Sequence, residues 1–106
     1  MDWEVSPETL KDKLDNKEKF TLLDVREGWE RTAASIEPSK HIPMGEIPAQ
    51  VQELDPEEEI IVYCHHGVRS MNVTAWLRQQ GFENVASLRG GIDRWSRTID
   101  PKTPTY

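Results

Sequence analysis

The stretch that decides the fold is Ile60-Ile61-Val62-Tyr63-Cys64-His65-His66-Gly67-Val68-Arg69-Ser70. Residues 60–63 are an uninterrupted apolar run, largely β-branched, which is typical of a strand covered on both faces. A helix is predicted to begin at Ser70 and to continue to Gln80, so a short loop joins this strand to a helix. A strand buried on both faces needs helices above and below it, and the stretch therefore predicts an α/β fold.

The same alternation of strands and helices continues on both sides of this stretch. Strands are predicted at 20–25, 60–63 and 85–88 with an extended piece at 41–43, and helices at 6–15, 29–34, 45–53, 70–80 and after Gly90-Gly91. Gly81 is predicted to end the longest helix at C′, and Trp76 and Trp95 are assigned to the core. Strands separated by helices imply right-handed crossovers and a parallel sheet.

Length and composition favour one small soluble domain. The 106 residues, 36% of them hydrophobic, suit one domain over 1–106 and not two. The longest apolar run, Ile60–Cys64, is far shorter than the roughly 20 residues that cross a bilayer. Met1–Glu4 has neither the basic region nor the apolar stretch of a secretory signal. We therefore expect a cytoplasmic protein without a membrane partner.

The charge is distributed unevenly along the chain. The net charge is −6, but residues 1–59 carry 16 acidic and 7 basic side chains, a net −9, whereas residues 60–106 carry 3 acidic and 6 basic ones, a net +3. A polyanion would meet mostly repulsion, so no nucleic-acid partner is expected. The second half, by contrast, suits a small anion.

Cys64 is the single cysteine of the chain, which excludes an intramolecular disulfide and the disulfide-stapled secreted class. A lone cysteine is commonly a small buried apolar residue. Cys64, however, stands at the carboxyl end of a predicted strand, where open α/β sheets place their ligand crevice. The helix N-terminus that follows offers unpaired N–H groups, which bind anions.

The loop after Cys64 adds features that favour a thiolate over a thiol. Gly67 lets the backbone bend so that successive N–H groups converge, Arg69 adds a permanent cation, and His65 and His66 add further donors. A cysteine at a helix N-terminus beside cations is typically a nucleophile. The sequence thus predicts a nucleophilic Cys64 within an anion-binding loop.

Three motifs in order resemble a single-domain rhodanese over nearly the whole chain. They are Asp24-Val25-Arg26-Glu27, Cys64-x-x-Gly67-x-Arg69-Ser70 and Gly81-Phe82-x-Asn84-Val85-x-x-Leu88-x-Gly90-Gly91-Ile92-x-x-Trp95. Each is weak alone, but their ordered combination is specific. The resemblance implies a rhodanese-like fold, with a central parallel sheet of about five strands and helices on both faces.

The resemblance also implies sulfurtransferase chemistry without a cofactor or metal. A loop cysteine takes the outer sulfur of thiosulfate or of a persulfide donor, and then passes it to a thiol, cyanide or a protein acceptor. On this basis the catalytic residues are Cys64 and Arg69, the substrate-binding residues are His65, His66, Gly67, Val68, Arg69 and Ser70, and the structural residues are Asp24 and Arg26. The segment Ala34–Ser39 departs from the Gly-His-Ile-Pro-Gly-Ala usual in the family, which puts the geometry of that loop and the preferred donor in question.

Other functions fit less well. Cys-based phosphatases and arsenate reductases use a similar loop, but the phosphatases place five residues between cysteine and arginine where this chain has four. Non-catalytic rhodanese-like binding modules commonly lack the loop cysteine, which is present here. Three consecutive ligands, Cys64-His65-His66, cannot surround a tetrahedral metal ion. A Cys–His hydrolase stays open, although neighbouring loop histidines usually face solvent.

Overall fold

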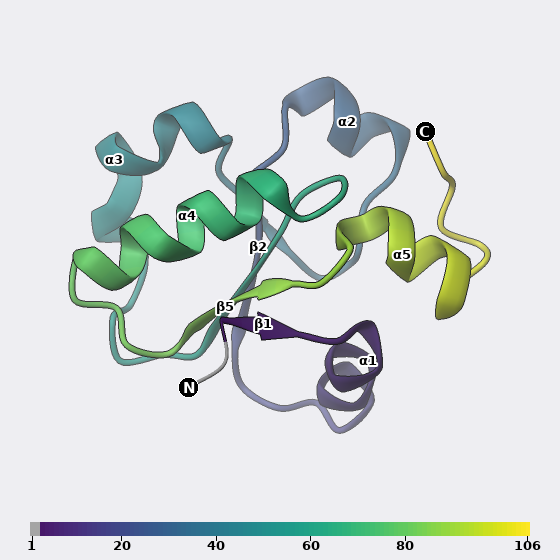
Figure 1. The fold of residues 1–106 in the computed structure, drawn as a ribbon, viewed down its shortest axis with the longest axis horizontal. Coiled ribbons are helices and arrows are strands. Elements are labelled where there is room, and N and C mark those ends of the chain that lie inside the picture. Colours follow the sequence, from purple (N-terminus) through teal and green to yellow (C-terminus); the bar gives the residue numbers. More distant parts are fainter. Residues whose placement is uncertain (1–2) are drawn as a thin grey trace.

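The centre of the molecule is a parallel sheet, shown in Figure 1 from a computed structural model that describes residues 3–106. Within those residues five strands follow the order β1-β5-β4-β2-β3. They are β1 (Glu4–Val5), β2 (Thr21–Asp24), β3 (Lys40–His41), β4 (Ile60–Tyr63) and β5 (Val85–Leu88). This confirms the predicted sheet, to which β1 adds a strand that the sequence did not indicate. Met1 and Asp2, part of the stretch in which no secretory signal is expected, lie outside the described residues.

Helices occur in the five regions where the sequence predicts them, but the longest begins at Val68 and not at Ser70, and only Ile47–Gln50 of the predicted 45–53 is α-helical. They are α1 (Pro7–Asp15), α2 (Gly28–Ala33), α3 (Ile47–Gln50), α4 (Val68–Gln79) and α5 (Gly91–Thr98), with 3₁₀ turns η1 (Met44–Glu46) and η2 (Val51–Glu53) on either side of α3. Ser6 caps α1 because its hydroxyl accepts the Thr9 N–H at 3.1 Å. Between residues 3 and 106, none of these helices has the length and apolar character needed to cross a bilayer.

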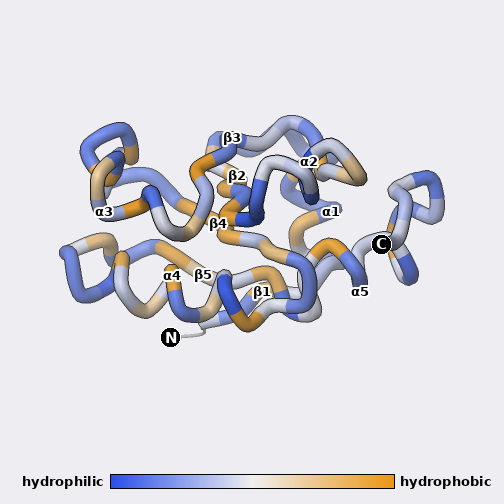
Figure 2. The backbone as a smooth tube through the Cα atoms, turned by 90° about the horizontal axis from the view of Figure 1, so that it is seen from above, coloured by the Kyte–Doolittle hydropathy of each residue, from blue (hydrophilic) through white to orange (hydrophobic). Residues whose placement is uncertain are grey.

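Alternate residues of the central strands enter two separate hydrophobic clusters. Leu23 of β2 and Val62 of β4 pack with residues of α3 and α4, whereas Leu22 and Ile61 pack with residues of α1 and α5. This is the period of two expected of strands, whose side chains point to opposite faces in turn. Figure 2 shows the hydrophobic residues gathered along the strands in the middle of the molecule. The sheet is therefore covered by helices on both faces, as predicted.

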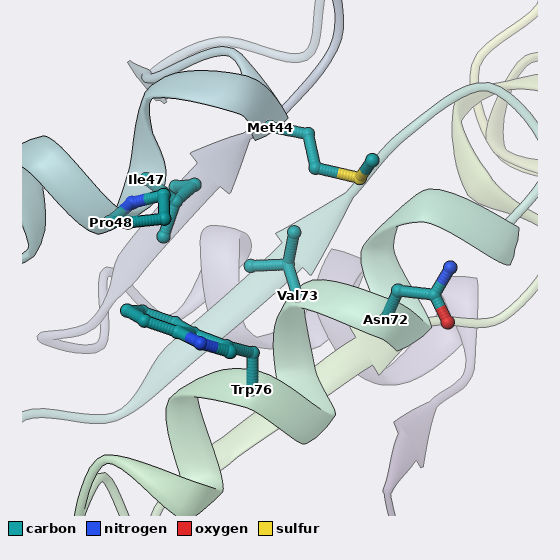
Figure 3. Close-up of a pocket in the computed structure, with 6 residues that line it drawn as sticks. All are labelled: Met44, Ile47, Pro48, Asn72, Val73 and Trp76. Atoms are coloured by element: carbon teal, nitrogen blue, oxygen red, sulfur yellow. The ribbon is translucent and has the colours of Figure 1, made fainter.

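Two further predictions concern α4 and the tryptophans. Gly81 follows α4 with φ of +98°, and the Phe82 N–H returns to Leu77 O at 3.1 Å, which confirms the predicted C-terminal cap. Trp95 is buried with 5% exposure. Trp76, assigned to the core from sequence, is only partly buried. It lies at the rim of a shallow groove between α3 and α4, because its position on α4 faces the gap between these helices (Figure 3).

Candidate active site

The loop that follows β4 turns sharply into α4. Cys64 directly follows β4, and Gly67 precedes α4 with φ of +110°. This left-handed conformation is strained for residues other than glycine. The turn brings the first amides of α4 back toward the end of the strand, at the carboxyl edge of the sheet where the sequence analysis places the site.

Two backbone amides point at the sulfur of Cys64. The N–H groups of Gly67 and Ser70 lie 3.1 and 3.3 Å from Sγ. The thiol in turn lies 3.4 Å from Ser70 Oγ, to which it donates. Cys64 is 1% exposed, so its sulfur forms the floor of the loop. Donors in this arrangement stabilise negative charge on sulfur, which is the condition for a nucleophilic cysteine.

Ser70 extends this set of polar contacts beneath the loop. Its hydroxyl donates to Gly67 O at 3.2 Å and lies 2.7 Å from the hydroxyl of Ser87 on β5. Both serines are fully buried. The sequence motifs do not indicate Ser87. Its contact with Ser70 arises only in the folded chain, where β5 pairs with β4.

Helix α5 holds the loop from its other side. The N–H groups of Ile92 and Asp93 donate to the carbonyl oxygens of Cys64 and His65 at 2.9 and 3.1 Å. This approach needs Gly91, where an added Cβ would lie 2.5 Å from Cys64 O and 2.4 Å from His65 O. This explains the second glycine of the Gly90-Gly91 pair noted in the sequence, because a side chain at Gly91 would clash with the backbone of the Cys64 loop.

Arg69 forms a two-pronged ion pair with a carboxylate that the sequence did not single out. Its Nη1 and Nη2 atoms donate to Glu30 Oε1 and Oε2 at 2.7 and 2.8 Å. The hydrogen bonds from Arg69 lower the pKa of Glu30 to about 2. The same pair raises the pKa of Arg69. Glu30 has 3% exposure and lies on α2. The one sequence signal that bears on it is its position within the helix predicted at 29–34.

The two loop histidines differ in environment. The His65 ring is stacked on the ring of Tyr106 at a centroid distance of 4.0 Å and meets the tilted ring of His66 at 3.9 Å. Burial and the neighbouring His66 lower the pKa of His65. Its Nε2 atom is buried with no hydrogen-bond partner among residues 3–106. The side chain of His66 is 63% exposed and lies 3.9 Å from Asp93.

The structure therefore separates the predicted substrate-binding residues. The backbones of Gly67 and Ser70 face the Cys64 sulfur, whereas Val68 is 71% exposed at the start of α4. The guanidinium of Arg69 is engaged by Glu30. The roles of the predicted residues toward a substrate stay predictions.

Among residues 3–106, the group whose geometry could accommodate a metal ion is His65, His66 and Asp93, whose candidate ligand atoms lie within 4.8 Å of one another. This group differs from the Cys64-His65-His66 run considered in the sequence. Asp93 Oδ2 already accepts from Arg97 Nε at 3.0 Å, so a cation here would compete with a guanidinium.

A buried ion pair lies beneath the site. Arg26 Nε and Nη2 donate to the two Asp24 oxygens at 2.9 and 2.8 Å, and both residues are fully buried. Burial alone would raise the pKa of Asp24, but the hydrogen bonds from Arg26 outweigh it and hold the pKa below its ordinary value. A buried charge pair needs such complete bonding to be tolerated.

The same pair anchors the atypical segment Ala34–Ser39. Arg26 Nη2 donates to Ala34 O at 2.7 Å, and the Ile36 N–H donates to the hydroxyl of Tyr63 at 3.2 Å. Ile36 is buried with 3% exposure. The segment is thus fixed to the core through these backbone groups and also through the Ser39 hydroxyl, which accepts from Arg31 Nη1 at 3.0 Å.

Tyr106 is a further residue at the site that the sequence analysis did not find. The C-terminal tail is irregular, runs back from α5 and ends beside α2 (Figure 1). Tyr106 Oη accepts from Arg26 Nη1 at 2.9 Å and donates to Glu30 Oε2 at 2.7 Å. Burial and the bond to Glu30 raise the pKa of Tyr106 to about 12. The phenol is therefore protonated, and a donor, at neutral pH.

Comparison with known proteins gives one consistent relationship. The family model "Rhodanese-like domain" matches residues 6–98. A "Sulfurtransferase" of Allochromatium vinosum is 35% identical over 89% of this chain and 88% of its own length. A "Thiosulfate sulfurtransferase GlpE" of Actinobacillus pleuropneumoniae is 35% identical over 97% of this chain and 94% of its own length. YtwF of Bacillus subtilis is 39% identical over 93% and 95%, respectively.

Solved structures show the same fold. A rhodanese-like domain protein from Staphylococcus aureus has a TM-score of 0.85 at 27% identity, over 100% of this chain and 99% of that chain. A rhodanese-related protein from Thermoplasma volcanium has a TM-score of 0.82 at 30% identity, over 91% and 92% of the two chains.

Proposed function

The chain belongs to the family of rhodanese-like domains, and from this premise we propose that it transfers sulfane sulfur through a persulfide on Cys64. Its relatives support a rhodanese-type sulfurtransferase. The observation that carries the persulfide step is the pair of N–H groups, from Gly67 and Ser70, directed at Cys64 Sγ. The same amides that stabilise a thiolate would hold the negative outer sulfur of a persulfide.

The proposed reaction has two balanced steps. The Cys64 thiolate attacks the outer sulfur of the donor, so that a new S–S bond forms while the donor's own S–S bond breaks. With thiosulfate, the electron pair of the broken bond leaves with sulfite. A thiolate or cyanide then attacks the outer sulfur of the Cys64 persulfide and takes it, and the electron pair returns to Cys64 as a thiolate. Neither step needs a cofactor.

The donor that fits the loop is a small anion. The loop lies in the half of the chain with a net charge of +3, and the helix N-terminus adds further positive potential. Thiosulfate and persulfide donors both carry a sulfane sulfur next to negative charge. We assign Arg69 the role of holding positive charge beside the loop, and its fixed pairing with Glu30 defines where that charge lies.

The acceptors in this proposal are cyanide, a small thiol or a protein thiol. Each attacks the same outer sulfur, and an external nucleophile is required because Cys64 is the single cysteine of the chain. We also propose a cytoplasmic setting, because reducing compartments keep a thiol free between turnovers.

The experiment that tests this function is thiocyanate formation from thiosulfate and cyanide. Wild-type protein should form thiocyanate in a protein-dependent reaction, and Cys64→Ser should reduce the rate to that of buffer alone. Thr105→Ala, which alters an exposed side chain and leaves the cysteine and both amides in place, is the control and should retain most of the rate. The proposal is wrong if Cys64→Ser forms thiocyanate as fast as the wild type.

A further inference from the structure

Tyr106 contacts one end of the loop that surrounds the Cys64 sulfur directly, and it is linked to the other end through Glu30. Its ring lies parallel to that of His65, the first loop residue, at 4.0 Å and 9°. Its hydroxyl donates to Glu30 Oε2, and the same oxygen accepts from Arg69 at the other end of the loop. We propose that Tyr106 is a positioning residue for sulfur transfer, which holds the loop in the conformation that directs its amides at Cys64. This inference rests on the proposed function.

The direction of the Tyr106 hydroxyl is fixed by its surroundings. Arg26 Nη1 donates to Tyr106 Oη at 2.9 Å, so the phenol proton is left for Glu30. Arg26 is itself fully buried and bonded to Asp24, which makes it a rigid anchor. Tyr106 thereby links a fixed point of the core to the carboxylate that positions Arg69.

The ring of Tyr106 acts on the other end of the loop. His65 is held by the Asp93 N–H at its carbonyl oxygen and by Tyr106 at its side chain. Trp29 of α2 meets the Tyr106 ring edge-on at 5.9 Å, in a geometry that aromatic pairs favour. The stacked contact with His65 and the edge-on contact with Trp29 thus fix the Tyr106 ring and restrain His65, two residues before the Gly67 amide that faces the sulfur.

The tail that carries Tyr106 is attached along its length. Thr103 is buried, and its N–H and hydroxyl donate to Asp100 at 3.0 and 3.1 Å. Ser96 of α5 donates to Pro104 O at 3.4 Å. These contacts place the tail against the molecule before it reaches the loop, so that little freedom is left at residue 106. Thr105, between these attached residues, is exposed.

The first test measures how fast Cys64 takes sulfur from thiosulfate in a single turnover, followed by quenching and intact mass. Tyr106→Ala should lower the second-order rate constant about tenfold, the worth of one charge-assisted hydrogen bond. Most of the loss should appear as a higher half-saturating donor concentration, because the loop that binds the anion is no longer preorganised. Tyr106→Phe keeps the ring and should recover part of the rate. Thr105→Ala should match the wild type.

The second test separates positioning from general stability. Amide hydrogen exchange at Gly67 and Ser70 should increase at least about fivefold in Tyr106→Ala, while the amides of β4 should stay near the wild-type rate. Unchanged sulfur uptake with unchanged exchange at Gly67 would overturn the inference, as would equal acceleration throughout β4. If the wild type itself takes no sulfur from any donor, the proposed function fails, and the loop exchange alone decides whether Tyr106 orders the loop.

Discussion

Arg69 and Glu30 are 39 residues apart in sequence, yet they form a two-pronged pair with distances of 2.7 and 2.8 Å. The pair joins the first turn of α4, which follows the Cys64 loop, to α2. Glu30 is buried, and a buried carboxylate is tolerated only when it is bonded in this way. The cation of the anion-binding loop is therefore positioned by an element far away in the chain.

Replacing Arg69 tests its assignment beside the loop. Arg69→Ala should slow sulfur transfer more than about tenfold, since a charge-assisted hydrogen bond contributes roughly 1.5–3 kcal/mol. Arg69→Lys keeps the charge but not the planar guanidinium, and its rate should lie between those of the wild type and Arg69→Ala. Steady-state kinetics over a range of thiosulfate concentrations measure the effect. Unchanged donor affinity and rate in Arg69→Ala would remove this residue from the substrate-binding set.

Glu30 should make stability depend on acid pH. Because its pKa is lowered to about 2 in the folded protein from 4.5, its contribution is full above about pH 4.5 and is lost as the pH falls toward 2. The difference in unfolding free energy between wild type and Glu30→Gln should therefore shrink over this range. Urea unfolding at a series of pH values measures it. A difference that stays constant from pH 6 to pH 2.5 would contradict the assigned pairing.

Gly91 should not tolerate a side chain. Its φ is +62°, and a Cβ would lie within 2.5 Å of the Cys64 and His65 carbonyl oxygens. Strain and overpacking of this kind cost about 2–4 kcal/mol together. Gly91→Ala should lower the urea midpoint accordingly and also slow sulfur transfer. Gly28→Ala, where nothing lies within 4 Å of the added Cβ, is the control and should change the midpoint little. Equal midpoints for the two variants would show that α5 does not need this close approach.

Trp76 and Trp95 should differ in their contribution to stability. Trp95 is 5% exposed, and truncation of a buried tryptophan costs about 3–5 kcal/mol. Trp76 is only partly buried at the groove shown in Figure 3, so Trp76→Ala should cost clearly less. Thermal and urea unfolding of both variants provide the comparison. A larger loss for Trp76 than for Trp95 would contradict the assignment of Trp95 to the core.

Much of the fold is predictable because its signals are local. The apolar run 60–63, the Gly81 stop and the short strand at 85–88 each lie within a few residues, and all three occur in the structure as expected. Strand β1 has no such signal, because Glu4–Val5 is short and is defined only by pairing with β5. Trp76 packs against the core but stays partly exposed, because the period of a helix does not tell how completely another element covers its apolar stripe.

The site residues can be divided in the same way, into those with a local sequence signal and those without one. Cys64 and Gly67 are recognisable since strand end, glycine and helix start are adjacent in sequence. Glu30 and Tyr106 are not, because each acts through contacts with residues at least 39 positions away. A tyrosine in an irregular tail carries no pattern that distinguishes it from a solvated residue, and only the folded chain brings it to the loop.

The most direct measurement is the intact mass of the protein after incubation with thiosulfate and removal of the excess donor. We predict that the mass rises by one sulfur atom, returns to its starting value after cyanide or dithiothreitol is added, and does not change in Cys64→Ser. The persulfide should persist until such a nucleophile arrives, because Cys64 is the single cysteine of the chain. A wild-type mass that never increases with thiosulfate or a persulfide donor would contradict the account and favour a non-catalytic binding domain.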